Sequence, residues 1–195
     1  MTISLRPYQA RMEQETAEAY AAGYRYILNQ LSTGGGKTWL LASQVANTDG
    51  PTCTIVHRQE LLGQISRTYA AAGIRHSIMA PQPVINWIIE THVQEFGRSF
   101  FTPRSDTMVA GVDTLVRRYK PGNRWCNTVV KWLVDECAHT LGLKLPFDQA
   151  NKWGKACQLF PNALGYGVTA TPIRADRRSL HVDQGGAFDY LVQGA

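Results

Sequence analysis

Residues 32–38 read Ser-Thr-Gly-Gly-Gly-Lys-Thr, a combination suited to binding phosphate. Glycines let successive backbone N–H groups curl around an anion without Cβ clashes, and the N-terminus of a following helix adds partial positive charge. The lysine can reach the β- and γ-phosphates of a nucleotide, and the threonine hydroxyl can hold Mg²⁺. We therefore expect the phosphates to contact Thr33, Gly34, Gly35, Gly36, Lys37 and Thr38.

One position departs from the strict phosphate-loop pattern, because Leu31 stands where a glycine is usual. The alternative interpretation is a flexible glycine turn that happens to precede Lys37 and Thr38. The flanking segments favour phosphate binding, since a predicted strand at residues 26–31 precedes the glycines and a predicted helix at 37–46 follows them.

Two adjacent carboxylates, Asp135 and Glu136, follow the apolar run at residues 131–134. Ligands of a parallel α/β sheet bind at the carboxyl ends of strands, so we expect both side chains beside the phosphate loop. Asp135 would hold Mg²⁺, directly or through water, and Glu136 would orient and deprotonate an attacking water. Alone, such a pair fits a solvated strand exit equally well. Joined to the phosphate loop, it predicts hydrolysis of a nucleoside triphosphate.

Short apolar runs alternate with helix-length segments along the chain. Predicted strands cover residues 26–31, 52–56, 108–112, 129–134 and 164–168, and predicted helices cover 37–46, 59–72, 84–96 and 151–160. This alternation predicts an α/β fold with a mainly parallel sheet and helices on both faces. Core or interface positions, rather than base-stacking platforms, are expected for Trp87, Trp125, Trp132 and Trp153.

The composition sets broad limits on the class of protein. With 44% hydrophobic and 18% charged residues, the chain can bury a sizeable core. A formal net charge of +5 fits a polyanionic partner but is too modest to establish one. The four cysteines form no CxxC pair, which favours core thiols over a zinc or redox site. No apolar run approaches the roughly 20 residues of a membrane helix and no signal peptide is evident, so the cytoplasm is the expected compartment.

With Asp-Glu-Cys-Ala-His at residues 135–139, the sequence resembles the DEAD/DEAH-box helicases of superfamily 2, particularly those of phages and mobile elements. Further segments fit the family's motif order. Residues 5–9 look like the adenine-reading Q-type motif, 56–64 like motif Ia, 110–118 like motif Ib or its neighbour, and 169–172 like motif III. The resemblance covers nearly the whole chain and implies a RecA-like P-loop NTPase domain that uses ATP and Mg²⁺.

The resemblance also implies roles for residues near the N-terminus. Gln9 has an amide that can both donate to and accept from an adenine edge, and Tyr8 or Arg6 would flank the base. The alternative is that this segment is only the entry to a helix, with Pro7 in its first turn.

Other implied roles concern coupling and nucleic acid. His139 would link motif II to motif III through the hydroxyls of Thr169 and Thr171, which makes His139 a catalytic candidate beside Lys37 and the two carboxylates. The arginines of motifs Ia and Ib suit nucleic-acid phosphates, with solvated surface charges as the alternative. The expected nucleic-acid contacts are His57, Arg58, Thr114 and Arg117.

A superfamily 2 motor needs two RecA-like lobes, and too few residues follow Pro172 for a second one. We expect residues 1–195 to form a single ATP-binding lobe, with 1–25 as the Q-motif-like segment and 173–195 as the start of a connection to a second lobe supplied in cis or in trans. The predicted function is a nucleic-acid-dependent ATPase, a helicase or translocase with DNA favoured over RNA, in a bacterial or phage-infected cell. The alternatives are an ATP-responsive nucleic-acid-binding module with little turnover and a P-loop NTPase of another class, such as a kinase.

Overall fold

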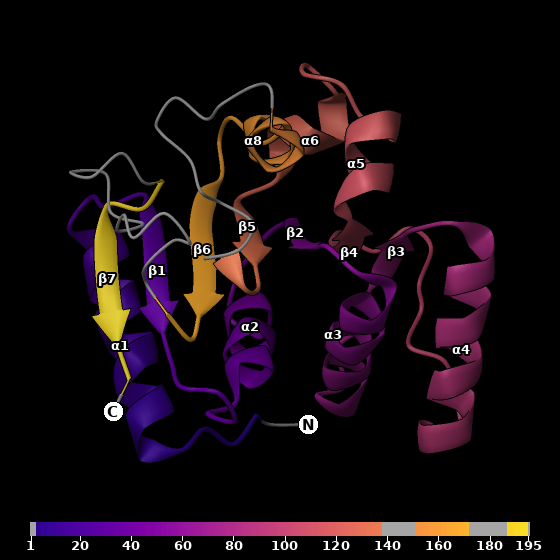
Figure 1. Cartoon of the computed structure of the whole chain (residues 1–195), viewed down its shortest axis with the longest axis horizontal. Helices are drawn as coiled ribbons and strands as arrows, with labels where there is room; N and C mark the ends of the chain where they lie inside the picture. The colour runs from indigo at the N-terminus through magenta and orange to yellow at the C-terminus, as the bar shows by residue number, and fades with distance from the viewer. Residues whose placement is uncertain (1–2, 138–150, 172–186, 195) are drawn as a thin grey trace.

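A sheet of seven strands, all paired in parallel, forms the centre of the computed structural model (Figure 1). The structure describes residues 3–137, 151–171 and 187–194. The strand order is β3-β4-β2-β5-β6-β1-β7. The strands are β1 (Tyr26–Gln30), β2 (Thr52–Val56), β3 (Ser77–Met79), β4 (Thr107–Gly111), β5 (Lys131–Val134), β6 (Leu164–Thr169) and β7 (Tyr190–Gln193).

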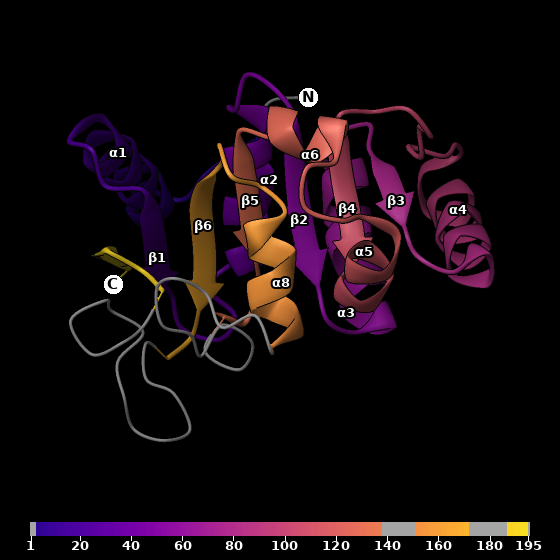
Figure 2. The same ribbon diagram turned by 90° about the horizontal axis from the view of Figure 1, so that it is seen from above.

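Helices cover both faces of the sheet (Figures 1 and 2). One face carries α1 (Pro7–Ala21), α2 (Lys37–Ala46), α3 (Gln59–Ala71) and α4 (Gln82–Phe96). The other face carries α5 (Val112–Arg118), α6 (Arg124–Thr128) and α8 (Lys152–Gln158). None of the helices in the described ranges is long and apolar enough to cross a membrane. The α/β fold class predicted from the sequence is confirmed.

The apolar runs of the central strands are explained by burial on both faces. On β5, Leu133 packs with residues of α2, α3 and α4, whereas Trp132 and Val134 pack with residues of α5, α6 and α8. All four residues of β5 and all five of β2 are buried. A strand covered on both faces needs apolar side chains at successive positions. These strands therefore do not alternate between polar and apolar residues.

Element bounds agree with the sequence prediction where the pattern is strong. The helix at 37–46 and the strand at 52–56 are observed as predicted, and each of the other predicted elements differs by one or two residues at one or both ends. The short strand β3, the helices α5 and α6, and β7 were not predicted. β7 pairs with β1 from Ile27↔Tyr190 to Gln30↔Gln193, so residues 190–193 of the expected connecting segment belong to this sheet.

The four tryptophans divide between the core and the contacts between helices. Trp132 and Trp153 are buried and Trp125 is partly buried, whereas Trp87 is 48% exposed. The Trp87 ring lies across α3 at Gly63, where an added Cβ would come within 2.7 Å of the ring. Trp87 therefore occupies a shallow position over a neighbouring helix backbone and not a place in the core. The four cysteines are all buried, as predicted for core thiols.

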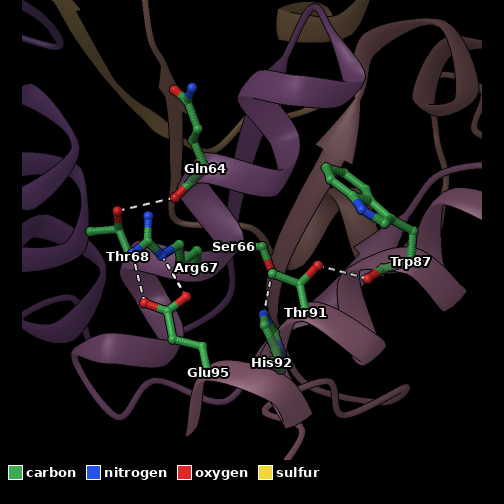
Figure 3. Close-up of polar contacts among 8 residues, drawn as sticks. All are labelled: Gln64, Ser66, Arg67, Thr68, Trp87, Thr91, His92 and Glu95. Carbon is green, nitrogen blue, oxygen red and sulfur yellow. Dashed lines mark hydrogen bonds and ion pairs between the residues drawn. The ribbon is translucent and has the colours of Figure 1, made fainter.

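Polar contacts join α3 to α4 (Figure 3). Arg67 donates to both carboxylate oxygens of Glu95, with its Nε 2.6 Å from Oε2 and its Nη2 2.7 Å from Oε1. Deeper in the same interface, the Ser66 hydroxyl lies 3.0 Å from His92 Nε2 and 2.6 Å from Nε2 of His76 in the segment before β3. The Arg67–Glu95 ion pair is exposed to solvent, and such pairs contribute little to stability. The buried serine and histidines therefore contribute more to the stability of this interface.

The hydrogen positions of this buried group follow from its outer partners. His92 Nδ1 accepts the N–H of Phe100 at 3.2 Å, so His92 carries its hydrogen on Nε2. His76 Nδ1 lies 2.9 Å from the carbonyl oxygen of Ile74 and must donate to it. Ser66 therefore accepts from His92 and can donate to Nε2 of a neutral His76, so the hydrogen bonds are satisfied with both imidazoles neutral.

We expect acid to destabilise the fold through His76. Burial lowers the pKa of His76 from 6.5 to about 4. Above pH 6.5 both folded and unfolded chains hold the neutral ring, and as the pH falls toward 4 the unfolded chain takes up the proton first. The free energy of unfolding should fall by up to about 3 kcal/mol across this window. Denaturant titrations at pH 7 and pH 5 test this. His76→Gln should flatten the dependence, the exposed control His57→Gln should not, and equal slopes for the two variants would contradict the assignment.

Candidate nucleotide and nucleic-acid site

The carboxyl ends of β5, β6 and β1 are neighbours in the sheet. Gln30 at the end of β1 is paired with Thr169 at the end of β6, and Val134 at the end of β5 is paired with Gly167. The Leu31 N–H donates to the Thr169 carbonyl at 2.9 Å, which extends the β1–β6 pairing into the phosphate loop. The phosphate loop, the acidic pair and the first residues of motif III therefore leave the sheet side by side.

Lys37 and Glu136 meet at this edge. Lys37 Nζ lies 2.7 Å from Glu136 Oε1, and the two side chains are 12% and 33% exposed. Lys37 is the first residue of α2, directly after the glycines, and Glu136 is the second residue after β5. The structure thus brings together two residues that the sequence places 99 positions apart.

The backbone at Glu136 is in the left-handed region, with a φ of 51°. An L-residue with a Cβ adopts this conformation at a cost of roughly 1–2 kcal/mol, and such strain is typical of functional sites. Two contacts hold the residue there: the ion pair with Lys37, and its N–H, which donates to Asp135 Oδ1 at 2.7 Å. The strained turn is what directs the Glu136 side chain to the phosphate loop.

Asp135 is partly buried beside Glu136. Burial raises the pKa of its carboxyl above the ordinary value, and the Glu136 carboxylate raises it further, while the Glu136 N–H and the Lys37 ammonium lower it. The Asp135 carboxylate and the Thr38 hydroxyl, at the same end of the sheet, are hard oxygen donors of the type that Mg²⁺ takes. Both residues therefore have the chemistry that the metal role expected for them requires, and that role stays a prediction.

Glycine is required at two positions of the loop. Gly36, the N-cap of α2, has a φ of 84°, and a Cβ there would come within 2.6 Å of Gln9 Nε2. At Gly35 a Cβ would come within 2.5 Å of the Leu31 side chain. Leu31 is itself only 1% exposed and packs in the core beneath the loop. The departure from the usual pattern at Leu31 is therefore accommodated by the glycine four residues later.

Gln9 is bound to the phosphate loop. Its Nε2 donates to the Gly35 carbonyl at 3.0 Å and faces the Gly36 carbonyl at 3.4 Å, and its Oε1 accepts the Arg6 N–H at 2.9 Å. Tyr8 also donates its hydroxyl to the Gly35 carbonyl, at 2.8 Å. The start of α1 is thereby tied to the loop through two side chains.

A cleft of about 380 Å³ opens beside these contacts, within the size range of small-molecule sites. Arg6, one of the predicted nucleotide contacts, lines it and is exposed. Trp39, which was not among the predicted site residues, also lines it and is 38% exposed. The available signal was its position two residues after Lys37, in the first turn of the helix that follows the loop. The remaining lining comes from Ile3, Ser4, Gln9, Gly36, Ala71 and Ala72.

The expected nucleic-acid contacts lie together at the same end of the sheet. β2 and β4 are paired in register, so the turns that follow them are adjacent. A cleft of about 170 Å³ between these turns is lined by all four predicted residues: His57, Arg58, Thr114 and Arg117. Arg58 and Arg117 are exposed, whereas Thr114 is buried.

Motif III is described only in part. The Thr169 hydroxyl is buried, donates to the Thr171 carbonyl at 2.8 Å and accepts the Thr171 N–H at 3.3 Å. The two threonines thus form a local turn after β6. His139, their expected partner, lies outside the described residues.

Comparison with known proteins gives a family match and several structural matches. The family described as type III restriction enzyme, res subunit, matches residues 2–174. Comparison with curated protein sequences gives no match. The UvsW helicase from bacteriophage T4 superposes with a TM-score of 0.58 at 16% identity, covering 96% of this chain and 59% of that one.

Two further solved structures have the same fold. A nuclease-deletion mutant of the type ISP restriction-modification enzyme LlaGI, in complex with a DNA substrate mimic, gives a TM-score of 0.62 at 14% identity and covers 98% of this chain and 20% of that one. The Pyrococcus furiosus Hef helicase domain gives 0.58 at 14% identity, with coverages of 93% and 37%. This chain thus spans at most 59% of these structures. It belongs to the family of the type III restriction enzyme res subunit, and its fold is that of the N-terminal RecA-like lobe of superfamily 2 helicases.

Proposed function

We propose that this chain is the ATP-binding lobe of a nucleic-acid-dependent ATPase, a helicase or translocase whose second lobe completes the catalytic site. The observation that carries the proposal is the 2.7 Å contact between Lys37 and Glu136. It joins the cation of a phosphate loop to the carboxylate best placed to act as a general base, although the strands that carry them, β1 and β5, are separated by β6 in the parallel sheet. The DNA substrate mimic bound to LlaGI supports DNA as the favoured nucleic acid.

In this proposal the Lys37 ammonium leaves the Glu136 carboxylate and binds the nucleotide phosphates when ATP enters the site. A bound Mg·ATP supplies the reacting phosphoryl group and the metal charge that neutralises it. Thr38 and Asp135 would hold the metal, and the backbone N–H groups of the loop would bind the phosphates. With Lys37 on the phosphates, the Glu136 carboxylate would orient and deprotonate the attacking water.

Replacement of Lys37 by alanine should abolish nucleotide binding while leaving the fold intact. The side chain makes an ion pair at the sheet edge and takes no part in the hydrophobic core. Saturating Mg·ATP should raise the melting temperature of the parent chain, since a ligand that binds only the folded state stabilises it. The exposed lysine of α8 supplies the control, as Lys155→Ala should keep the full shift. An equal shift for Lys37→Ala and parent would remove the basis of the proposed function.

Nucleic-acid binding should depend on salt through Arg58. Removing one ionic interaction with a DNA phosphate should flatten the slope of log K against log salt concentration by roughly 0.7–0.9. We expect Arg58→Ala to do so for single-stranded DNA. Arg75→Ala, an exposed arginine before β3 and outside the cleft, should leave the slope unchanged. Fluorescence anisotropy between low and physiological salt measures both, and a salt-independent affinity would exclude the cleft as the binding surface.

A further inference from the structure

We propose that the groove between α5 and α8 binds the second strand of a nucleic-acid duplex, next to the cleft at Arg58 that is expected to hold the first strand. The inference rests on the proposed nucleic-acid-dependent function and adds a binding surface to it. None of the four nucleic-acid contacts expected from the sequence lines this groove.

The positive charge of the chain is concentrated on the face that carries α5, α6 and α8 (Figure 2). Residues 112–128 and 151–158, which contain these helices, include six basic residues and one acidic residue. The rest of the chain has equal numbers of basic and acidic residues, so these two segments account for the whole formal net charge of +5. Such an asymmetry attracts a polyanion to one face of a protein. The basic residues are Arg117, Arg118, Lys120, Arg124, Lys152 and Lys155, and the acidic residue is Asp113.

Most of this charge is available to a ligand. Lys152 is paired with Asp113 at 3.1 Å, but the ion pairs between described residues include none of the other five cations. Those five side chains belong to exposed residues. Lys120 Nζ donates to the Val116 carbonyl at 3.3 Å and keeps two further N–H donors. The surface therefore presents cations that protein carboxylates do not neutralise.

The groove itself is a cleft of about 250 Å³ between the end of α5 and α8. Lys120, in the turn after α5, and Lys155, on α8, both line it. The Tyr119 ring lines it too and packs against Trp125, with ring centroids 6.0 Å apart. Two lysines beside an aromatic hydroxyl and the amide of Gln158 are groups that commonly bind the phosphates and sugars of a nucleic-acid backbone.

α8 connects this groove to the cleft at Arg58. Near the start of α8, the Trp153 ring lies 6.1 Å from the His57 ring, and Lys152 is paired with Asp113. His57 and Asp113 both line the cleft at Arg58. Lys155, farther along the same helix, lines the groove. A ligand bound in the cleft is therefore beside the helix that forms one wall of the groove.

α5 separates the two sites by about the width of a helix. Thr114 and Arg117 line the cleft at Arg58, whereas Val116 and Lys120 line the groove. A helix with its side chains is about 10–12 Å across, and the major groove that separates the backbones of B-DNA is about 12 Å wide. The spacing therefore suits the two strands of one duplex.

The direction of the groove also favours a second strand. A strand that follows the turns after β2 and β4 crosses the carboxyl edge of the sheet. The groove lies along the face instead, because the chain continues from α5 through α6 to the start of β5 at the opposite edge. One strand would have to turn around α5 to occupy both sites.

Salt titrations of a blunt DNA duplex and of a single strand of the same length, followed by fluorescence anisotropy, test the inference. Lys120→Ala/Lys155→Ala should flatten the duplex slope of log K against log salt concentration by about 1.8, at roughly 0.9 for each phosphate contact. It should leave the single-strand slope unchanged. Lys120→Arg/Lys155→Arg keeps both charges and should retain the parent slopes. Arg11→Ala/Arg75→Ala removes two exposed cations outside this face and should change neither slope.

Arg58→Ala separates this inference from the proposed function. It should flatten both slopes, because both ligands contain a strand for the cleft at Arg58. If it does so while Lys120→Ala/Lys155→Ala keeps the parent duplex slope, the inference is wrong and the basic face serves another polyanion, such as an acidic protein segment. Equal losses of slope for duplex and single strand would place both sites on one strand and would also overturn it. Failure of the parent chain to bind either DNA would instead contradict the proposed function.

Discussion

Replacing Glu136 by glutamine should strengthen nucleotide binding and nearly abolish turnover. The substitution removes the charge that pairs with Lys37 at 2.7 Å, so the phosphates no longer compete with a carboxylate for the lysine. Glutamine has almost the same shape, so the strained backbone at φ 51° faces no new steric demand. It is not a base, and loss of a general base typically costs about 10²–10⁴-fold in rate.

Affinity is measured on the chain itself by calorimetry with Mg·ATP, and turnover is measured in a protein that carries both lobes. Glu95→Gln is the matched control, because Glu95 also forms an ion pair, with Arg67, but on the exposed faces of α3 and α4 (Figure 3). That variant should change neither quantity. Unchanged turnover in Glu136→Gln would show that another group activates the water. Weaker binding would show that the ion pair does not oppose the phosphates.

The parts of the fold that the sequence predicted well are those determined by local patterns. The runs at residues 52–56 and 131–134 are buried on both faces, and the glycines before Lys37 require a turn between a strand and a helix. β3 and β7 depend on long-range contacts instead. β3 has three residues, too few to show a period, and β7 is an edge strand whose place is decided by pairing with β1. Neither partner is near it in the sequence.

In the candidate site, the residue types could be predicted from the sequence, but the contacts between them could not. The residue types at Lys37, Asp135 and Glu136 already indicated phosphate and metal chemistry. The direct contact between Lys37 and Glu136 was not foreseeable, because it needs a left-handed backbone at a residue that is not glycine. The same limit applies to Gln9, whose amide is bonded to the loop only because α1 packs beside it. Trp39 could not be predicted as a site residue, because its exposure follows from how α1 and α3 border the cleft.

Supplying a second RecA-like lobe should produce the largest change in activity. The described residues form one sheet with one phosphate loop, and the solved structures with this fold are considerably longer than this chain. In the part of the cleft beside the loop that the structure describes, the lining arginine is Arg6, which donates to Tyr8 and is expected to flank the base. We propose that the arginine which neutralises charge developing on the γ-phosphate comes from the other lobe.

An arginine delivered across the cleft in this way is worth about 10³–10⁵ in turnover in related phosphoryl-transfer enzymes. The chain alone should therefore bind Mg·ATP, hydrolyse it very slowly and fail to unwind duplexes. Fusion to a second lobe, or its addition in trans, should restore ATPase activity that single-stranded DNA or RNA stimulates. The measurement is steady-state ATPase with and without nucleic acid, and the control is the same second lobe with its cleft-facing arginine replaced by alanine. Robust stimulated turnover by the chain alone would mean that a group within this lobe performs the neutralisation.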